Sequence, residues 1–235
     1  NNFSGQLGNG TAANSIAPVA VKNLLDVTAI SCGEKFVLAL KGDGTVGAWG
    51  NNTYGQLGDG TVVDKSTFAP VKNLNHVTAI AAGWNHCLAL KSDGTVWAWG
   101  SNGNGQLGDG TTTSHSTPVQ ISGLSGIVSI AAGDKFSFAV GDGGTAYAWG
   151  YNGSGRLGIG STSQKTTPQE LTGVTGVVQI AAGSAQGYAL CGDGSVYAWG
   201  ANESGELGNA SFAGSTSPVK ISRISGVVQL AGGQD

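Results

Sequence analysis

The segment AWGSNGNGQLG at residues 98–108 decides the fold, because the chain carries a version of it four times. Its Ala-Trp-Gly begins at residues 48, 98, 148 and 198, a spacing of 50 residues each time. Asn recurs at 52, 102, 152 and 202, and Leu-Gly begins at 57, 107, 157 and 207. A fixed period of this length indicates stacked repeats that bury a shared core. We therefore predict a single repeat domain of about 4.7 blades over residues 1–235, with repeats 1–50, 51–100, 101–150 and 151–200 and a partial repeat 201–235.

Each repeat is expected to fold into short antiparallel strands. In the second repeat, residues 77–82, 87–91 and 95–99 are short apolar or alternating runs, which are typical of strands. Asp93-Gly94 predicts a hairpin with a type I′ turn, in which both central residues adopt positive φ. A fourth strand is expected around Val71, Val119 or Val219. Four antiparallel strands in a repeat of this length predict an all-β fold, a β-propeller of four-stranded blades.

The repeated tryptophan is expected to lie between blades. A lone blade cannot bury both of its faces, so neighbouring blades must stack, and a large ring would fill the gap between them. Burying such a ring removes ~150–250 Å² from water, which stabilises the fold by several kcal/mol at about 25 cal/mol/Å². The leucine of each Leu-Gly is expected in the same seam. The predicted structural residues are Trp49, Trp99, Trp149, Trp199, Leu57, Leu107, Leu157 and Leu207.

Composition and charge exclude several classes of protein. Glycine makes up 42 of the 235 residues, but it does not occur at every third position and there are only 5 Pro, which excludes collagen. Hydrophobic residues make up 40% of the chain and 6 residues are Trp, which argues against disorder. The net charge is −3 and no basic run exists, so we predict no binding to nucleic acid. No apolar run approaches the roughly 18 residues of a membrane span, so we predict no membrane insertion.

The repeat resembles a known family. Its pattern is Gly-x-x-His-x-x-Ala-Leu, then Asp-Gly, then Trp-Gly-x-Asn-x-x-Gly-Gln-Leu-Gly, carried in the second repeat by Gly83, His86, Ala89, Leu90, Asp93, Gly94, Trp99, Gly100, Asn102, Gly105, Gln106, Leu107 and Gly108. This pattern is similar to the regulator of chromosome condensation repeat family. The resemblance implies a propeller of typically seven blades. It also implies nucleotide exchange on a small GTPase with attachment to chromatin, or, as in some bacterial relatives, inhibition of an enzyme.

Two positions depart from the family pattern. The family's histidine occurs only as His86, and the equivalent residues are Phe36, Phe136 and Gln186. The glutamine found at 6, 56 and 106 is replaced by Arg156 and Glu206.

No group of residues predicts catalysis, a cofactor or a metal site. His86 is expected to pack or hydrogen-bond, whereas His76 and His115 lie in different loops without a partner signature. The cysteines are far apart and are expected to pack as small hydrophobes; they are Cys32, Cys87 and Cys191. Asp59 and Asp109 recur with the period, which indicates turn chemistry, with calcium as the alternative. The glycines of 103–108 match a dinucleotide motif but lack its strand-turn-helix context.

One loop varies in sequence while the framework around it repeats. It carries the candidate protein-contact residues Glu34, Lys35, Trp84, Asn85, Asp134, Lys135 and Ser184. Because these positions are equivalent, they should line one face of the propeller. Trp84 is the main candidate, because it places a large ring at a loop tip. The loops at 62–68, 112–116 and 163–166 are expected on the opposing face.

These observations favour a non-enzymatic module that binds proteins or has a structural role. Low charge, the absence of Met and loops rich in Ser, Thr, Asn and Gly favour a secreted or surface-associated microbial protein, in an extracellular or cell-surface location. A nucleotide-exchange or chromatin-associated propeller, cytoplasmic or nuclear, is the alternative, and an enzyme inhibitor is another. A propeller must close, because open edges invite pairing. We therefore expect the chain to be a fragment of a longer seven-bladed protein or to close with another chain.

Overall fold

Short strands that alternate between the two faces of a sheet fold here into four antiparallel sheets. The structure is a computed structural model and describes residues 1–233. Each sheet is a meander of four strands in chain order, which confirms the prediction of an all-β propeller with four-stranded blades. The described part contains one 3₁₀ turn, Gly153–Gly155. It contains no helix long and apolar enough to cross a membrane.

The blades are numbered in chain order. Blade 1 contains β1 (Val27–Cys32), β2 (Phe36–Lys41), β3 (Val46–Gly50) and β4 (Lys65–Pro70). Blade 2 contains β5 (Val77–Ala82), β6 (His86–Lys91), β7 (Val96–Gly100) and β8 (His115–Gln120). Blade 3 contains β9 (Ile127–Ala132), β10 (Phe136–Gly141), β11 (Ala146–Gly150) and β12 (Lys165–Glu170). Blade 4 contains β13 (Val177–Ala182), β14 (Gln186–Cys191), β15 (Val196–Gly200) and β16 (Ser215–Lys220).

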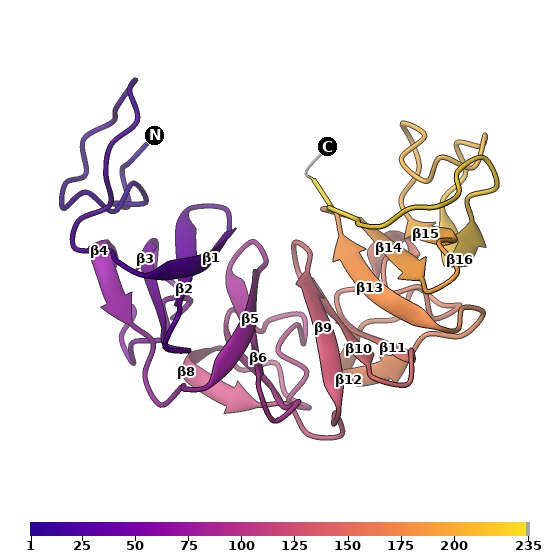
Figure 1. The fold of residues 1–235 in the computed structure, drawn as a ribbon, viewed down its shortest axis with the longest axis horizontal. Helices are drawn as coiled ribbons and strands as arrows, with labels where there is room; N and C mark the ends of the chain where they lie inside the picture. The colour runs from indigo at the N-terminus through magenta and orange to yellow at the C-terminus, as the bar shows by residue number, and fades with distance from the viewer. Residues whose placement is uncertain (234–235) are drawn as a thin grey trace.

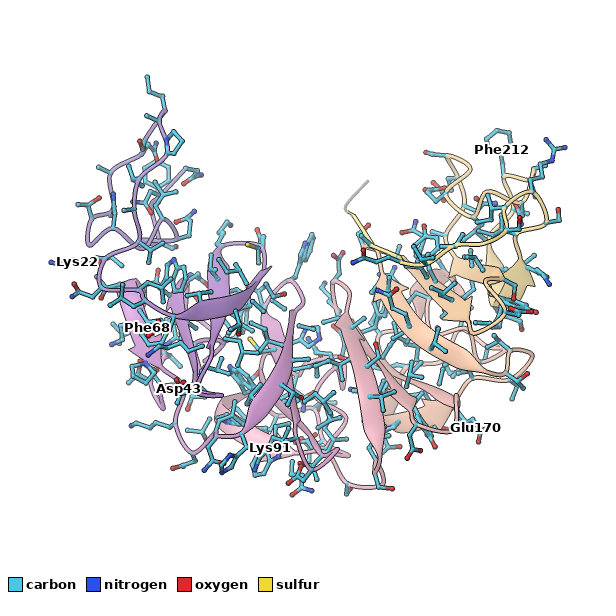
Figure 2. All side chains as sticks on the ribbon, in the orientation of Figure 1. Lys22, Asp43, Phe68, Lys91, Glu170 and Phe212 are labelled. Atoms are coloured by element: carbon cyan, nitrogen blue, oxygen red, sulfur yellow. The ribbon has the colours of Figure 1, made fainter. Side chains whose placement is uncertain are left out.

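The four blades are arranged in an arc (Figure 1). The first strands of the blades, β1, β5, β9 and β13, lie along its concave side, and the last strands, β4, β8, β12 and β16, lie along its outer rim. Charged side chains such as Lys22, Lys91 and Glu170 lie on the outside of the arc (Figure 2). We call the turn that joins the first and second strands of a blade its first turn. Because the first strands line the concave side, these turns lie close to the axis of the propeller.

Each blade takes its strands from two consecutive sequence repeats. Blade 1 closes with β4, which follows the Trp-Gly of β3 and belongs to repeat 51–100. The partial repeat 201–235 supplies β16 to blade 4. A sequence repeat therefore contributes to two blades: repeat 51–100, for example, supplies the last strand of blade 1 and the first three strands of blade 2.

The hairpin turn differs from its predicted type. Gly94 has φ of 76°, but Asp93 does not have positive φ, so the turn is not type I′. Gly94 N donates to Lys91 O (3.0 Å), and Lys91 N donates to Thr95 O (3.0 Å). This pattern is a type I turn followed by a glycine in the left-handed region. Asp93 Oδ1 accepts from Thr95 N (3.0 Å) and Thr95 Oγ1 (2.6 Å), which holds the aspartate in the turn.

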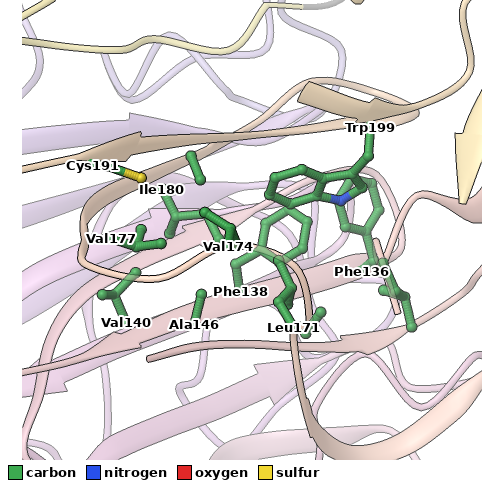
Figure 3. Close-up of a cluster of buried hydrophobic side chains, with 13 residues drawn as sticks. Phe136, Phe138, Val140, Ala146, Leu171, Val174, Val177, Ile180, Cys191 and Trp199 are labelled. Atoms are coloured by element: carbon green, nitrogen blue, oxygen red, sulfur yellow. The ribbon is translucent and has the colours of Figure 1, made fainter. Parts of the chain in front are cut away.

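The core consists of seams between neighbouring blades. Between blades 3 and 4, the ring of Trp199 meets that of Phe138 edge to face, with centroids 5.6 Å apart. Phe138 in turn meets Phe136 edge to face at 5.2 Å (Figure 3). Leu157 and Leu171 are buried in the same cluster. Equivalent clusters lie between blades 1 and 2 and between blades 2 and 3. Hydrophobic stabilisation is therefore repeated along the arc rather than concentrated in one centre.

Candidate functional site

The tips of the first turns lie in a row along the inner edge of the arc. Glu34 N donates to Trp84 O (3.1 Å), and Trp84 N donates to Asp134 O (3.2 Å), so backbone hydrogen bonds join the turns of blades 1, 2 and 3. A concavity of about 370 Å³ is lined by the equivalent segments 32–34, 82–84, 132–134, 182–184 and 232–233. The structure thus brings the tip residues Glu34, Trp84, Asp134 and Ser184 around one concavity.

The tip side chains differ from blade to blade. Glu34 and Lys35 form an exposed ion pair at 3.0 Å. In the next blade, Trp84 is half-buried, and its Nε1 is buried without a hydrogen-bond partner. Lys135 Nζ lies 5.9 Å from the centroid of the Trp84 ring, within the range of a cation–π interaction. The tips therefore present an ion pair, an indole and a carboxylate side by side.

The long connection after each Trp-Gly lies on the same face as these turns. Asn51 N donates to Lys35 O (2.8 Å), and Ser101 N donates to Asn85 O (2.8 Å). The expectation that 62–68, 112–116 and 163–166 lie on the opposing face is therefore wrong, and most of these residues belong to the connections and last strands. The reason is topological: β3 runs antiparallel to β2, so it ends beside the turn at which β2 begins. We call the surface formed by the first turns and the connections the turn face.

A buried asparagine organises each connection. Asn102 Oδ1 accepts from Leu107 N (3.0 Å), while its Nδ2 donates to Thr111 O (3.2 Å) and Thr113 O (3.0 Å). The equivalent bonds to Leu and to the two carbonyls recur in the other complete connections, at Asn52, Asn152 and Asn202. One side chain therefore closes the loop over a buried leucine.

Below the turn face, each repeated tryptophan bonds the preceding connection. Trp99 Nε1 donates to Gln56 O (2.9 Å), and the same bond joins Trp49 to Gln6, Trp149 to Gln106 and Trp199 to Arg156 at 2.9–3.0 Å. Every one of the four Trp-Gly tryptophans is buried, as are Leu57, Leu107, Leu157 and Leu207. At Gly100, φ is 97° and an added Cβ would lie 2.6 Å from Asn85 O. The glycine of Trp-Gly thus lets the connection approach the neighbouring turn.

The other polar candidates are structural. His86 is fully buried, and its Nε2 lies 2.9 Å from Ser137 Oγ in blade 3. Ser137 Oγ donates to Gln106 O (2.8 Å), so the imidazole Nε2 donates to the hydroxyl. Burial lowers the pKa of His86 to about 4, so the ring is neutral at neutral pH. His115, expected in a loop without a partner, begins β8 and lies 2.9 Å from Asp109 Oδ2.

The cysteines and the repeated aspartates are the remaining side chains that could bind a metal ion. Cys87 and Cys191 are buried, whereas Cys32 is exposed beside the concavity, so the expectation that it packs as a core hydrophobe is wrong. Asp59 Oδ1 accepts from Thr61 N (2.9 Å) and Thr61 Oγ1 (2.7 Å), which is turn chemistry. Within residues 1–233, no three His, Cys, Asp or Glu side chains are grouped so that they could hold a metal ion.

Arg156 was not among the predicted site residues. Its Nε donates to Gly153 O (2.9 Å) within the connection, and its Nη1 donates to Ser184 O (3.1 Å) in the next blade. Its guanidinium lies over the ring of Tyr151, 4.7 Å from the centroid. Burial lowers its pKa, an effect that the nearby Tyr151 and Asp134 oppose. The signal was present in the sequence as a departure from the glutamine found at 6, 56 and 106.

Comparison with known proteins agrees with this geometry. The family model of the RCC1-like domain matches residues 1–235. Human WBSCR16 matches with a TM-score of 0.89 and 26% identity over 100% of this chain and 64% of that one. Prp20p of Saccharomyces cerevisiae matches with a TM-score of 0.76 and 27% identity over 88% and 54%. Yeast RCC1 (Prp20) bound to Kap60 matches with a TM-score of 0.75 and 27% identity over 84% and 49%. Among curated proteins, none matches the sequence.

The chain belongs to the RCC1-like domain family, and its blades are those of an RCC1-like β-propeller. It spans about half to two thirds of the length of these solved relatives. The structure with Kap60 shows that a relative binds a protein, and the Prp20p structure is described together with binding to Gsp1p and histones.

Proposed function

We propose that this chain is a non-enzymatic protein-binding module and that the turn face is its contact surface. One observation carries the proposal. The three seams between the blades repeat the same Trp and Leu contacts, whereas the tip residues on the 370 Å³ concavity, Glu34, Trp84, Asp134 and Ser184, differ in every blade. Packing constrains the seams and leaves the tips free to vary, and variable loops on a rigid scaffold are where binding residues occur. The protein partners of the relatives support the same class of function.

The test compares variants of the two faces. The immobilised chain is used to recover proteins from its source, and their recovery is compared between wild type, Trp84→Ser on the turn face and Asp93→Ser on the hairpin at the other end of blade 2. A partner recovered by wild type and Asp93→Ser but lost by Trp84→Ser supports the proposal. A partner lost only by the hairpin variant contradicts it.

Nucleotide exchange on a small GTPase is the second candidate, favoured by the 27% identity to Prp20p. The measurement is the rate of nucleotide release from Gsp1p with and without this chain. Acceleration of release would favour exchange over a purely binding role. A secreted or surface location and inhibition of an enzyme remain predictions from the sequence.

A further inference from the structure

On the turn face, each connection lies beside the turn of the next blade. At two of these places, one side chain of the connection reaches that turn. Gln56 Nε2 donates to Asn85 Oδ1 (3.2 Å), which joins blades 1 and 2. Arg156 Nη1 donates to Ser184 O (3.1 Å), which joins blades 3 and 4. These two places are thus bridged by residues of the chain itself. Gln56 also folds back on its own connection, since its Oε1 accepts from Tyr54 N (2.9 Å) and its Nε2 donates to Asn51 Oδ1 (2.8 Å).

Between blades 2 and 3, the side chain of the equivalent Gln106 bonds only its own connection among the described residues. Gln106 Nε2 donates to Ser101 Oγ (3.3 Å), and Gln106 Oε1 accepts from Asn104 N (2.9 Å). A cleft of about 270 Å³ lies beside this side chain. Gly103, which lines the cleft, has open space where a Cβ would point, whereas the same position at Gly153 is covered by the Tyr151 ring. The cleft is therefore open where its neighbours are bridged.

The equivalent place between blades 3 and 4 shows which chemistry such a site holds. Its occupant is the guanidinium of Arg156, which donates to two carbonyl oxygens, Gly153 O and Ser184 O. It stacks on the ring of Tyr151 at 4.7 Å, and the charge of Asp134 favours its protonated form. A planar cation that both stacks and donates in several directions suits these walls.

We propose that the cleft between blades 2 and 3 receives an arginine side chain from a protein partner. The inference rests on the proposed function, because it names what the turn face binds. Gly103 occupies the position of Gly153, and Asp134 occupies that of Ser184 and adds a carboxylate to the wall. Trp84 and Tyr54 supply aromatic surface in place of Tyr151. The bound guanidinium takes the place that Arg156 fills one blade later.

The charges around the cleft agree with a cationic ligand. Lys135 is exposed, and its Nζ lies 5.9 Å from the centroid of the Trp84 ring, so this ring already holds a cation. Its long side chain can swing into solvent when a guanidinium stacks there. Asp134 places a carboxylate on the same wall, where its charge also acts on Arg156, and the chain as a whole carries a charge of −3. Arginine recognition by a carboxylate and an aromatic face is a recurring combination.

The test is a titration followed by NMR at the indole N–H of Trp84, which the spectrum of Trp84→Phe assigns. The probe is N-acetyl-arginine methylamide, and the lysine and glutamate analogues are the comparison ligands. We expect a saturable shift with the arginine probe in the millimolar range and a weaker response with lysine. Gln106→Arg should abolish the response, because the new side chain fills the cleft as Arg156 does. Asp134→Asn should weaken binding by about three- to tenfold, whereas Asp142→Asn, on the hairpin of the same blade, should leave it unchanged.

Absence of a saturable shift in wild type would overturn the inference, as would a stronger response to the glutamate probe. An unchanged response in a folded Gln106→Arg variant would also overturn the inference. If Gln106→Arg does not fold, unchanged binding of the arginine probe by Asp134→Asn would overturn it. If these results are negative while a partner is still lost by Trp84→Ser, the turn face binds by other chemistry, and only the arginine inference fails.

Discussion

The seams between the blades and the turn face above them come from the same repeats, yet only the seams repeat their Trp and Leu contacts from blade to blade. In the three seams a tryptophan Nε1 donates to the carbonyl of residue 56, 106 or 156, and Trp49 makes the same bond to Gln6 in the connection before blade 1, all at 2.9–3.0 Å. On the turn face the equivalent tips are Glu34, Trp84, Asp134 and Ser184. Interiors are packed without spare volume, so a change that empties part of a seam is destabilising. An exposed tip has few neighbours, so its chemistry can diverge without loss of the fold.

The largest effect is expected where a seam loses its ring. Trp99→Ala should lower the free energy of unfolding by about 3–5 kcal/mol, because it opens a cavity between blades 1 and 2 and leaves Gln56 O with only the weak Cys87 Sγ donor. Thermal and urea denaturation measure the change. Trp97→Ala is the matched control, since Trp97 lies two residues away on β7 and is only half-buried. A melting temperature of Trp99→Ala within a degree of wild type would show that the ring is not core.

A pH effect should follow from the buried histidine bridge. The folded pKa of His86, about 4, lies below the ordinary value, so unfolding takes up a proton between these values. Stability is fully present above pH ~6.5 and falls as the pH drops towards 4, by about 3 kcal/mol over the full window. Urea denaturation at several pH values measures this slope. His86→Phe, which installs the residue found at Phe36 and Phe136, should remove most of it. An unchanged slope in that variant would contradict the role given to His86.

A smaller loss is expected when a connection loses its asparagine. Asn102→Ala removes the acceptor of Leu107 N and one donor to two carbonyls, which should cost about 1–3 kcal/mol. Chemical denaturation measures the difference. Asn104→Ala, two residues further along and partly exposed, should change stability by less than about 0.5 kcal/mol. Equal losses in the two variants would mean that the buried hydrogen bonds do not hold the connection.

The turn tips should give the smallest change in stability. Glu34→Gln breaks an exposed ion pair with Lys35, and pairs of this kind contribute about 0–1 kcal/mol. We expect a melting temperature close to that of wild type in scanning calorimetry. A large shift would show that the tips belong to the framework, and the contrast between seam and face would not hold.

The sequence was most informative where a short motif indicates one kind of secondary-structure element. Asp-Gly marks a hairpin, and a recurring Trp in an alternating run marks a buried strand, so the strands of the second repeat were predicted to within a residue or two. The turn type was missed because Asp-Gly suits both type I′ and a type I turn with a following glycine. The choice between them depends on the hydrogen bonds between Lys91 and Thr95.

Other features depend on topology, which one repeat alone does not show. The face on which a connection lies follows from the direction of β3. Which four strands form one blade follows from the strand with which the fourth strand pairs. The role of Arg156 depends on reaching Ser184, 28 residues away in sequence. The departure from glutamine was visible in the sequence, but its meaning required the distance to the next blade.

The most direct test replaces the variable tips with the serine already present at 184. In Glu34→Ser/Trp84→Ser/Asp134→Ser all four tips become alike, and the measurement is binding of a partner recovered with wild type, on protein shown by calorimetry to be folded. We predict that binding is lost while the seams still melt cooperatively. Retention of wild-type affinity by the folded variant would contradict the central claim that the repeated seams provide stability and the varied turn face provides recognition.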